Sequence, residues 1–417
     1  MNRSIVLVLA ITSPAISGEL LKSGWKDQVL PTSARSADAF GSALAVTQKY
    51  MIVGAKRDDE TGKGSGAAYI FEHSGNAWVQ VSKLRPPTAS LSGAFGAAVG
   101  ISGNTVVVGA PQDSEKMKKA GAVYIFDRVS SGWLQSTRLA PADLKAGDGF
   151  GYSVAIDGDA MAVGVGHRKR ASSGGTVYIF RRVEGAWVIE TRLDGTLDAN
   201  EMFGYSVSLR GDTILIGAPG RSDSNSPGAA YTFSRRKGAW VQQTRMVAEA
   251  TVPGEYFGYS VALNDDISVV GSRRMDETCC QPGAAYVFRR RGDDWIQEAH
   301  LKTPGPRELF GWSVASFGPT IAVAAWSDRV SLSGSVPGSV YLFKRLERDW
   351  VSDQRLVADQ SNHFDLLTSA LALDGTDVAV GARLRGSDAT YVGAVFTYST
   401  SEARQEATRR HGHSGSN

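Results

Sequence analysis

Hydrophobic and polar residues follow one pattern along the chain, repeated every 53 to 55 residues. Each unit holds four segments rich in β-branched and aromatic residues, separated by Gly, Asp, Asn and Ser, and this pattern predicts short strands joined by tight turns. In the unit that starts at Phe95 the segments are FGAAVGI, TVVVGAP, GAVYIF and WLQSTRL. The last segment alternates apolar and polar positions, which is typical of an outer strand with one face in water.

The repeat occurs seven times. Phe-Gly pairs start at positions 40, 95, 150, 203, 257 and 310, and a seventh copy begins at Phe364 with Asp365 in place of Gly. That last copy has no Trp segment after GAVFTY, whereas GWKDQVL at Gly24–Leu30 precedes the first Phe-Gly pair. Four antiparallel strands in seven copies predict an all-β fold, a seven-bladed β-propeller over residues 18–398. We expect the N-terminal strand to complete the last blade, because only a closed ring brings the two ends together and removes exposed sheet edges.

Aromatic residues and glycines recur at fixed positions of the unit. We interpret the repeated Phe, Tyr and Trp as packing between neighbouring blades, which all pack in the same way, and a stacking platform for sugars or bases is the alternative. The Gly after each Phe is interpreted as a close approach of two backbones, and the Gly before each third strand as a turn residue.

The two ends of the chain differ from the repeat. Residues 1–17, MNRSIVLVLAITSPAIS, combine one Arg, the apolar run Ile5–Ile11 and small residues before Gly18, as in a secretory signal peptide. The apolar run is too short to span a bilayer. We therefore expect a secreted, periplasmic or cell-surface protein that does not insert into a membrane after signal removal. Residues 399–417 are predicted to form a disordered tail.

Charge and cysteine content exclude several classes of protein. The 417 residues include 45 basic and 42 acidic side chains, and a net charge of +3 does not indicate a nucleic-acid partner. Only two cysteines occur, Cys279 and Cys280, so the chain is not a disulfide scaffold. This adjacent pair is a candidate disulfide, and two reduced loop thiols are the alternative. No Cys/His spacing resembles a zinc site.

The order of the motifs resembles the FG-GAP repeat, the unit of the integrin alpha-subunit propeller and of many secreted bacterial proteins. FGAAVGISGNTVVVGAP at 95–111 and FGYSVSLRGDTILIGAP at 203–219 carry both halves of that motif. The resemblance implies a seven-bladed propeller and a binding role at a cell surface or outside the cell. Many FG-GAP repeats carry an acidic calcium loop between the first and second strands. Here short turns such as Asp157–Asp159 and Asn264–Asp266 stand in its place, so we expect no calcium site and no other cofactor.

Two Arg-Gly-Asp tripeptides, Arg210–Asp212 and Arg291–Asp293, fall where the repeat requires turns. We interpret them as turn residues rather than as an adhesive motif, because short matches arise easily among Gly-rich turns.

The connections between second and third strands are the candidate binding loops. In a propeller they share a face with the connections between blades, and variable loops on a rigid scaffold commonly carry function. The strongest positive charge in these loops is the run His167, Arg168, Lys169 and Arg170, followed by Arg273 and Arg274. These six residues are the candidate site for an anionic glycan or an acidic protein, and a solvated loop is the alternative.

The sequence contains no G-x-S-x-G elbow and no Walker A loop, and its histidines show no diagnostic spacing to a nucleophile or carboxylate. No catalytic, cofactor-binding or metal-binding residue is therefore assigned. The sequence indicates a non-enzymatic binding or adhesion module that engages an extracellular or cell-surface protein or glycan. Two alternatives stay open, a secreted polysaccharide-acting enzyme and a scaffold subunit of an exported complex.

Overall fold

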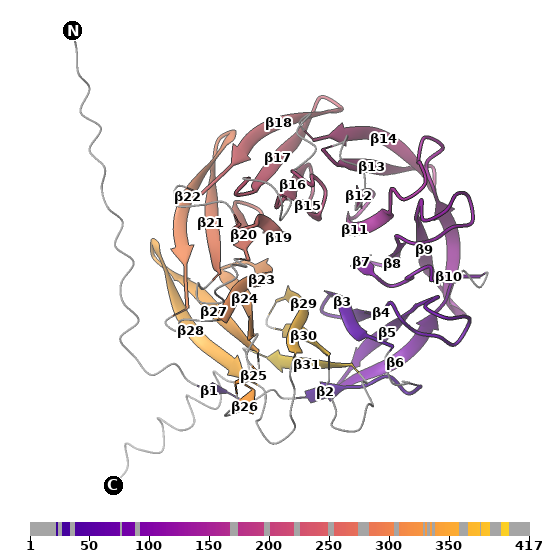
Figure 1. The fold of residues 1–417 in the computed structure, drawn as a ribbon, viewed down its shortest axis with the longest axis horizontal. Helices are drawn as coiled ribbons and strands as arrows, with labels where there is room; N and C mark the ends of the chain where they lie inside the picture. Colours follow the sequence, from indigo (N-terminus) through magenta and orange to yellow (C-terminus); the bar gives the residue numbers. More distant parts are fainter. Residues whose placement is uncertain are drawn as a thin grey trace.

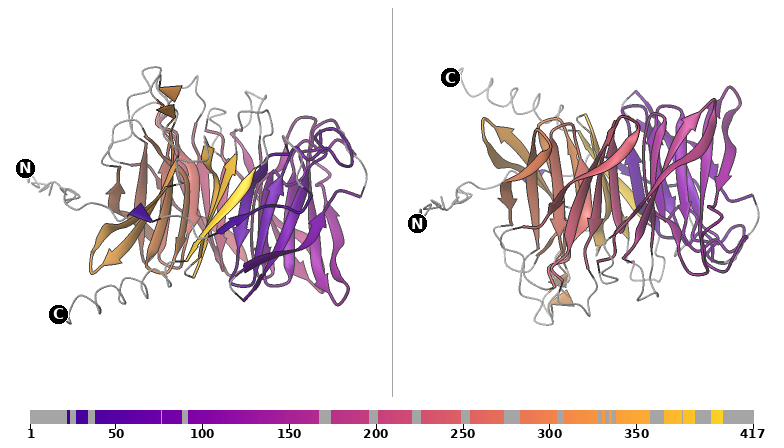
Figure 2. Two further views of the ribbon diagram at one scale, coloured as in Figure 1. Left: turned by 90° about the horizontal axis from the view of Figure 1, so that it is seen from below. Right: turned by 90° about the horizontal axis from the view of Figure 1, so that it is seen from above.

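The predicted seven-bladed β-propeller is confirmed. The computed structural model describes residues 22–23, 27–33, 38–75, 77–87, 92–166, 174–195, 201–220, 226–248, 254–273, 283–303, 308–327, 330–331, 334–335, 338–357, 366–375, 377–383 and 393–399. Their strands form seven sheets arranged as blades around a common centre (Figure 1), and the side views show one ring with strands running across its thickness (Figure 2). Within these ranges no helix is long and apolar enough to cross a membrane.

The blades are numbered in chain order, and the strands of each blade are given in order from the innermost to the outermost. Blade one comprises β3 (Phe40–Val46), β4 (Tyr50–Ala55), β5 (Ala67–Ser74) and β6 (Ala77–Leu84). Blade two comprises β7 (Ala98–Ser102), β8 (Thr105–Ala110), β9 (Ala122–Val129) and β10 (Gly132–Leu139). Blade three comprises β11 (Phe150–Asp157), β12 (Ala160–Val165), β13 (Thr176–Val183) and β14 (Ala186–Asp194). Blade four comprises β15 (Ser206–Arg210), β16 (Thr213–Ala218), β17 (Ala229–Arg236) and β18 (Ala239–Met246).

The last three blades keep this plan with additions at the sixth and seventh. Blade five comprises β19 (Phe257–Leu263), β20 (Ile267–Ser272), β21 (Ala284–Arg291) and β22 (Asp294–Leu301). Blade six comprises β23 (Glu308–Phe317), β24 (Thr320–Ser327), β27 (Ser339–Leu346) and β28 (Asp349–Val357), with a small hairpin of β25 (Val330–Ser331) and β26 (Gly334–Ser335). Blade seven comprises β29 (Leu366–Asp374), β30 (Asp377–Arg383) and β31 (Ala394–Ser399), completed by β2 (Asp27–Val29).

The N-terminal segment closes the ring, as the sequence predicts. β2 pairs antiparallel with β31, and Val29 lies opposite Val395. Val29 is buried in a cluster with Phe40 of blade one, so this strand also contacts the next blade around the ring. A feature that the sequence did not predict is β1 (Lys22–Ser23), which pairs in parallel with β28 of blade six. The N-terminal segment therefore adds β1 to the outer edge of blade six and supplies the outermost strand of blade seven.

The ends of the predicted domain lie partly outside the described residues. The expected signal peptide, residues 1–17, is outside them. β31 runs to Ser399, one residue beyond the predicted end of the propeller. Of the predicted C-terminal tail, only Ser399 is described.

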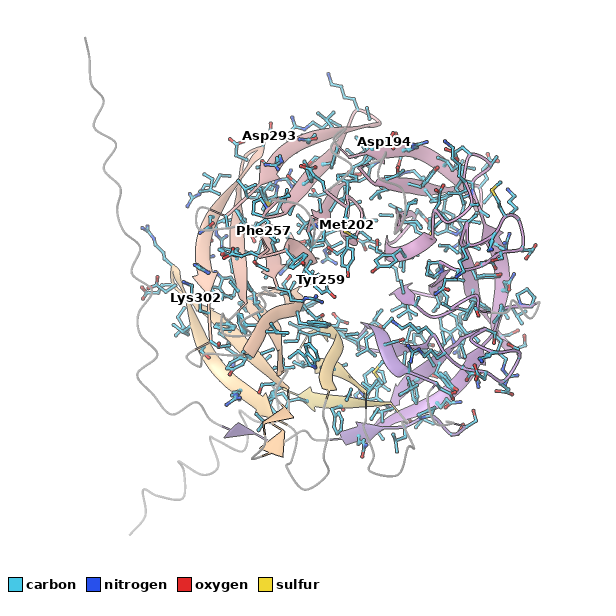
Figure 3. The ribbon with its side chains drawn as sticks, in the orientation of Figure 1. Asp194, Met202, Phe257, Tyr259, Asp293 and Lys302 are labelled. Carbon is cyan, nitrogen blue, oxygen red and sulfur yellow. The ribbon has the colours of Figure 1, made fainter. Side chains whose placement is uncertain are left out.

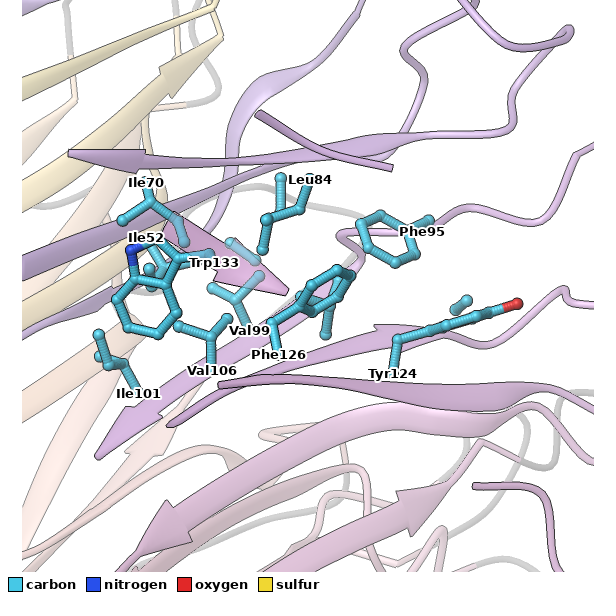
Figure 4. Close-up of a cluster of buried hydrophobic side chains, with 14 of the residues drawn as sticks. Ile52, Ile70, Leu84, Phe95, Val99, Ile101, Val106, Tyr124, Phe126 and Trp133 are labelled. Carbon is cyan, nitrogen blue, oxygen red and sulfur yellow. The ribbon is translucent and has the colours of Figure 1, made fainter. Parts of the chain in front are cut away.

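Apolar side chains fill the space between neighbouring blades. One cluster joins Ile52 and Ile70 of blade one to Val99 and Val106 of blade two (Figure 4). Trp133 extends this cluster and meets the Tyr50 ring edge-on, with 5.3 Å between ring centroids. The second strand β8 is buried along its length, the third strand β9 is buried over its first five residues, and β6 alternates between exposed and less exposed positions. The interpretation of the repeated Phe and Trp as packing residues agrees with this arrangement.

Glycine pairs set how closely the blades approach. A Cβ on Gly109 in β8 would lie 2.1 Å from the carbonyl oxygen of Gly151, which follows the Phe of blade three. The backbone of Gly151 itself has φ of +88°, in the left-handed region that favours glycine. The same contact recurs at four other seams, between residues 54 and 96, 164 and 204, 217 and 258, and 271 and 311.

The Gly before the third strand does more than turn the chain. Gly121 has φ of +89° and forms a parallel bridge with Phe150 of the next blade. A Cβ at this position would lie 2.2 Å from the Phe150 carbonyl oxygen. The repeated glycines after the Phe, in the second strand and before the third strand therefore all lie where one backbone touches the next blade.

Candidate functional site

In blades one, three, five and six, an irregularity in the innermost strand takes the residue after the Phe-Gly pair out of the hydrogen-bonded ladder. In blade three, Phe150 pairs with Val165 and Ser153 with Gly164, so Gly151 and Tyr152 stand out of the ladder. Blades five and six show the same shift. Bulges of this kind re-aim side chains. Tyr259 accordingly lies closer to the centre of the ring than Phe257 (Figure 3).

Four aromatic side chains at this position and one from a second strand form a continuous arc. Ring centroids are 5.2 Å apart for Tyr152 and Tyr205, 5.1 Å for Tyr205 and Tyr259, and 5.4 Å for Tyr259 and Trp312. Trp326 of β24 extends the series, 4.9 Å from Trp312. We call these five residues the aromatic arc. It spans blades three to six, whereas blades one and two carry Ser42 and Ala97 at the corresponding position.

Arg273 is the predicted site residue that the structure describes, and it packs against the aromatic arc. It follows directly after β20, and its guanidinium carbon lies 4.5 Å from the ring centroids of both Tyr259 and Trp312. One of its terminal nitrogens donates a hydrogen bond to the Tyr259 hydroxyl at 3.0 Å. The cation is thus held between aromatic faces, an arrangement in which electrostatic attraction to the ring adds to packing.

The five residues of the aromatic arc carry no charge of their own, and Arg273 supplies a positive charge beside them. Burial is the main cause that raises the pKa of Tyr205, and the neighbouring Tyr152 and Tyr259 raise it further. The Tyr205 phenol therefore stays protonated across the physiological pH range. Half-buried aromatic faces with phenol hydroxyls and one guanidinium can stack on a flat apolar ligand surface and hydrogen-bond to polar groups on it.

The aromatic arc lies on the face of the loops that the sequence singles out. At four seams the Gly before the third strand bridges to the Phe that opens the next blade, as in Gly228 with Phe257. The connections between second and third strands and those between blades therefore emerge on one face, which we call the loop face. His167, Arg168, Lys169, Arg170 and Arg274 lie outside the described residues, as do Cys279 and Cys280.

Repeated polar triads anchor the loops of this face. In blade two the Tyr124 hydroxyl donates to Asp113 at 2.7 Å, and Arg138 donates to the other carboxylate oxygen at 2.6 Å. Asp113 is 3% exposed and belongs to the connection between second and third strands. Equivalent triads use Tyr69, Asp58 and Lys83 in blade one, Tyr178, Asp143 and Arg192 in blade three, and Tyr231, Glu201 and Arg245 in blade four.

The triads were missed by sequence reasoning, although a signal exists. The Tyr of the third strand and the basic residue of the fourth recur in register, but the acidic partner comes from different connections in different blades. Burial, and next the hydrogen bond to Glu201, raise the pKa of Tyr231 to about 12. The tyrosines therefore act as hydrogen-bond donors that fix loop carboxylates rather than as acid–base groups.

The acidic turns on the opposite face connect blades to one another. The Asp157 carboxylate accepts a hydrogen bond from the Gly211 amide of blade four at 2.7 Å, and the Asn264 side chain donates to the Gly318 carbonyl of blade six at 3.0 Å. The first Arg-Gly-Asp turn is tied in the same way, because Arg210 pairs with Asp265 at 3.2 Å. In the second, Asp293 pairs with Arg236. No group of three or more His, Cys, Asp or Glu suited to a metal ion occurs among the described residues.

Comparison with known proteins gives similarities of two kinds. Human integrin alpha-7 is 28% identical over 290 residues, which are 58% of this chain and 23% of that protein. Mouse integrin alpha-7 is 31% identical over 183 residues, 39% of this chain and 14% of that protein. The chain thus matches less than a quarter of the length of these curated relatives.

The family model described as FG-GAP repeat matches this chain at residues 27–71, 78–126, 133–180, 194–233 and 240–288. Together these ranges cover more than half of the chain, and each takes in strands of a blade described above. The glycine contacts between blades explain why both halves of the repeated motif are needed. The chain therefore belongs to the FG-GAP repeat family and builds a seven-bladed propeller from its repeats.

Proposed function

We propose that this protein is a secreted or cell-surface, non-enzymatic binding module whose loop face engages a macromolecular partner, a protein or a glycan. The observation that carries the proposal is the aromatic arc with Arg273 held between Tyr259 and Trp312. Half-buried aromatic rings and arginine are the residue types that anchor partners at interfaces. Family membership and similarity to integrin alpha-7 support a binding role.

The scaffold beneath the aromatic arc is suited to this role. The blades are closed into a ring, and triads such as Tyr124, Asp113 and Arg138 fix loops of the same face. A partner that binds there meets side chains whose positions are already set, so little conformational entropy is lost on binding. We propose that the loop cations predicted from the sequence add positive charge to the same face. These are Arg168, Lys169, Arg170 and Arg274.

A capture experiment tests the proposal. Immobilised protein comprising residues 18–417 is offered the surface and secreted material of its source organism. One variant carries Arg273→Ser and Trp312→Ala on the loop face, and a second carries Ser at the loop cations Arg168, Lys169, Arg170 and Arg274. The control is Arg291→Ser, an exposed turn residue of the opposite face. Pretreating the material with protease or with periodate separates a protein partner from a glycan.

The proposal expects capture of a defined partner by the wild type and by Arg291→Ser, with loss in one or both loop-face variants. Equal capture by all four proteins moves the site away from the loop face. Failure of the wild type to capture a partner contradicts the binding function, and assays with small ligands and polysaccharide hydrolysis then become the next step.

A further inference from the structure

A repeated arginine connects each of blades two to six to the blade before it, on the face opposite the loop face. It is the second residue after the Tyr-x-Phe of the third strand, and it reaches the preceding blade. Arg235 of blade four forms an ion pair with Glu190 of blade three. In the same way, the arginine of blade six pairs with Glu298 of blade five. The members of this set are Arg128, Arg182, Arg235, Arg290 and Arg345.

Arg182 shows the full set of contacts. It donates to the Thr105 hydroxyl at 3.2 Å and, through both terminal nitrogens, to the two carboxylate oxygens of Asp127 at 3.4 Å. Its side chain also lies over the Trp187 ring, 5.9 Å from the centroid. A guanidinium fork facing a carboxylate in this way is a charge-assisted, two-point contact.

Arg290 occupies the equivalent place between blades four and five, but without the carboxylate. It donates to the Thr213 hydroxyl at 3.2 Å and lies over the Trp295 ring at 6.0 Å, as Arg182 does with Thr105 and Trp187. Where Asp127 stands in blade two, blade four has Ser234, whose hydroxyl accepts from Arg290 at 3.4 Å. Among the described residues, the contacts of the Arg290 guanidinium are thus with hydroxyls, the Gly292 carbonyl and an aromatic ring.

An open hollow of about 480 Å³ lies beside Arg290. Because a water molecule takes about 30 Å³ in the liquid, this hollow has room for a sugar ring as well as for an oxyanion. Its other charged lining residues already have partners: Asp157 accepts from Gly211, Arg210 pairs with Asp265, Asp212 is 3.9 Å from Arg181, Arg235 pairs with Glu190, and Arg236 pairs with Asp293.

We propose that this hollow binds an oxyanion group, sulfate or phosphate, which takes the place at Arg290 that the Asp127 carboxylate takes at Arg182. The missing carboxylate explains the ligand class, because a guanidinium fork matches the paired oxygens of sulfate and phosphate. Thr213 and Ser234 are both buried and supply hydroxyl donors beside the arginine. The oxyanion is either a free ion or a group carried by a sugar. This site lies on the face opposite the aromatic arc and is independent of the proposed function.

The repeat supplies matched variants for the test. Ser234→Asp places a carboxylate in front of Arg290, and Asp127→Ser removes the one in front of Arg182. Isothermal titration calorimetry measures binding of inorganic sulfate, inorganic phosphate and glucose 6-sulfate to the full-length protein, with sodium chloride keeping the ionic strength constant. Circular dichroism and thermal unfolding check that each variant is folded.

We expect saturable binding to the wild type and a loss of affinity of about tenfold or more in Ser234→Asp, because the new carboxylate competes for the guanidinium and repels the anion. Asp127→Ser is expected to add a second site of similar affinity. Glucose 6-sulfate that binds more tightly than inorganic sulfate identifies a sugar-borne group, and the reverse order identifies the free ion. Absence of saturable binding to the wild type, or equal affinity in the wild type and Ser234→Asp, overturns the proposal.

Discussion

The seam between blades two and three offers a direct test of how the repeat builds the ring. Gly109→Ala adds one methyl group whose carbon would lie 2.1 Å from the Gly151 carbonyl oxygen. The backbone of Gly109 is not in the left-handed region, so alanine is conformationally acceptable there. The clash is therefore the whole penalty of this substitution.

The size of that penalty follows from the atoms involved. Real Cβ contacts below 3.0 Å are essentially absent, so β8 and the start of β11 must separate by about 1 Å. Neither contact atom is the end of a flexible side chain, since the oxygen belongs to the backbone. Overpacking of a dense interior costs about 1–3 kcal/mol, and we expect Gly109→Ala to lie at the upper end, about 3 kcal/mol.

Equilibrium unfolding in urea measures the change. Gly158→Ala is the matched control, because its Cβ would meet nothing within 4 Å and only its φ of +57° is unfavourable. That control is expected to cost about 1 kcal/mol. Blade six carries Ala324 at the position of Gly109. The repeat after it has Asp365 at the position of Gly151, so neither glycine of the contact is present at this seam. Ala324→Gly removes a buried methyl group without relieving a clash and is therefore expected to cost about 1 kcal/mol. If Gly109→Ala costs no more than Gly158→Ala, the close approach of glycines does not hold the blades together.

Two further predictions concern buried polar groups. Asp113→Ala removes the shared acceptor of Tyr124 and Arg138 and is expected to cost about 2 kcal/mol, because the mostly buried Arg138 keeps only the exposed Glu115 as an ion-pair partner and the Tyr124 hydroxyl loses its acceptor; urea unfolding and faster proteolysis of the loop after β8 would show it, and unchanged values of both would refute it. His300 stacks on Tyr286, and burial, then Lys302, lowers its pKa to about 4. Since the unfolded pKa is near 6.5, His300 contributes stability above pH 6.5 that is lost as the pH falls toward 4. Unfolding measured from pH 4 to 7 should show a decline of about 1–2 kcal/mol that is absent in H300F, and an equal decline in both proteins would contradict this.

The fold could be predicted because the repeated motifs, the hydrophobic pattern and the turn residues all indicate the same four-stranded unit. The Phe-Gly pair, the buried second strand and the alternating fourth strand recur in register, and the missing Trp segment at one end is present at the other. β1 was not predicted, because two residues carry no periodicity and its pairing with β28 depends on the ring being closed.

The site could be predicted less well. The sequence identified Arg273 from loop charge, but its contact with Tyr259 and Trp312 depends on a bulge that sequence patterns do not show. The aromatic arc consists of residues about 54 positions apart that only ring geometry brings together. The difference between Ser234 and Asp127 is visible in the aligned repeats, but its meaning depends on the arginine that reaches over from the next blade.

Ring closure by the N-terminal segment is the central claim, since the positions of both faces depend on it. Deletion of residues 23–32 removes β2 and its contact with β31, exposes the edge of blade seven and uncovers the cluster around Phe40. Thermal unfolding should then occur at a lower temperature for the whole ring, and a peptide of residues 24–30 added in excess should raise it again by mass action. A melting temperature that the deletion leaves unchanged would contradict the closed ring.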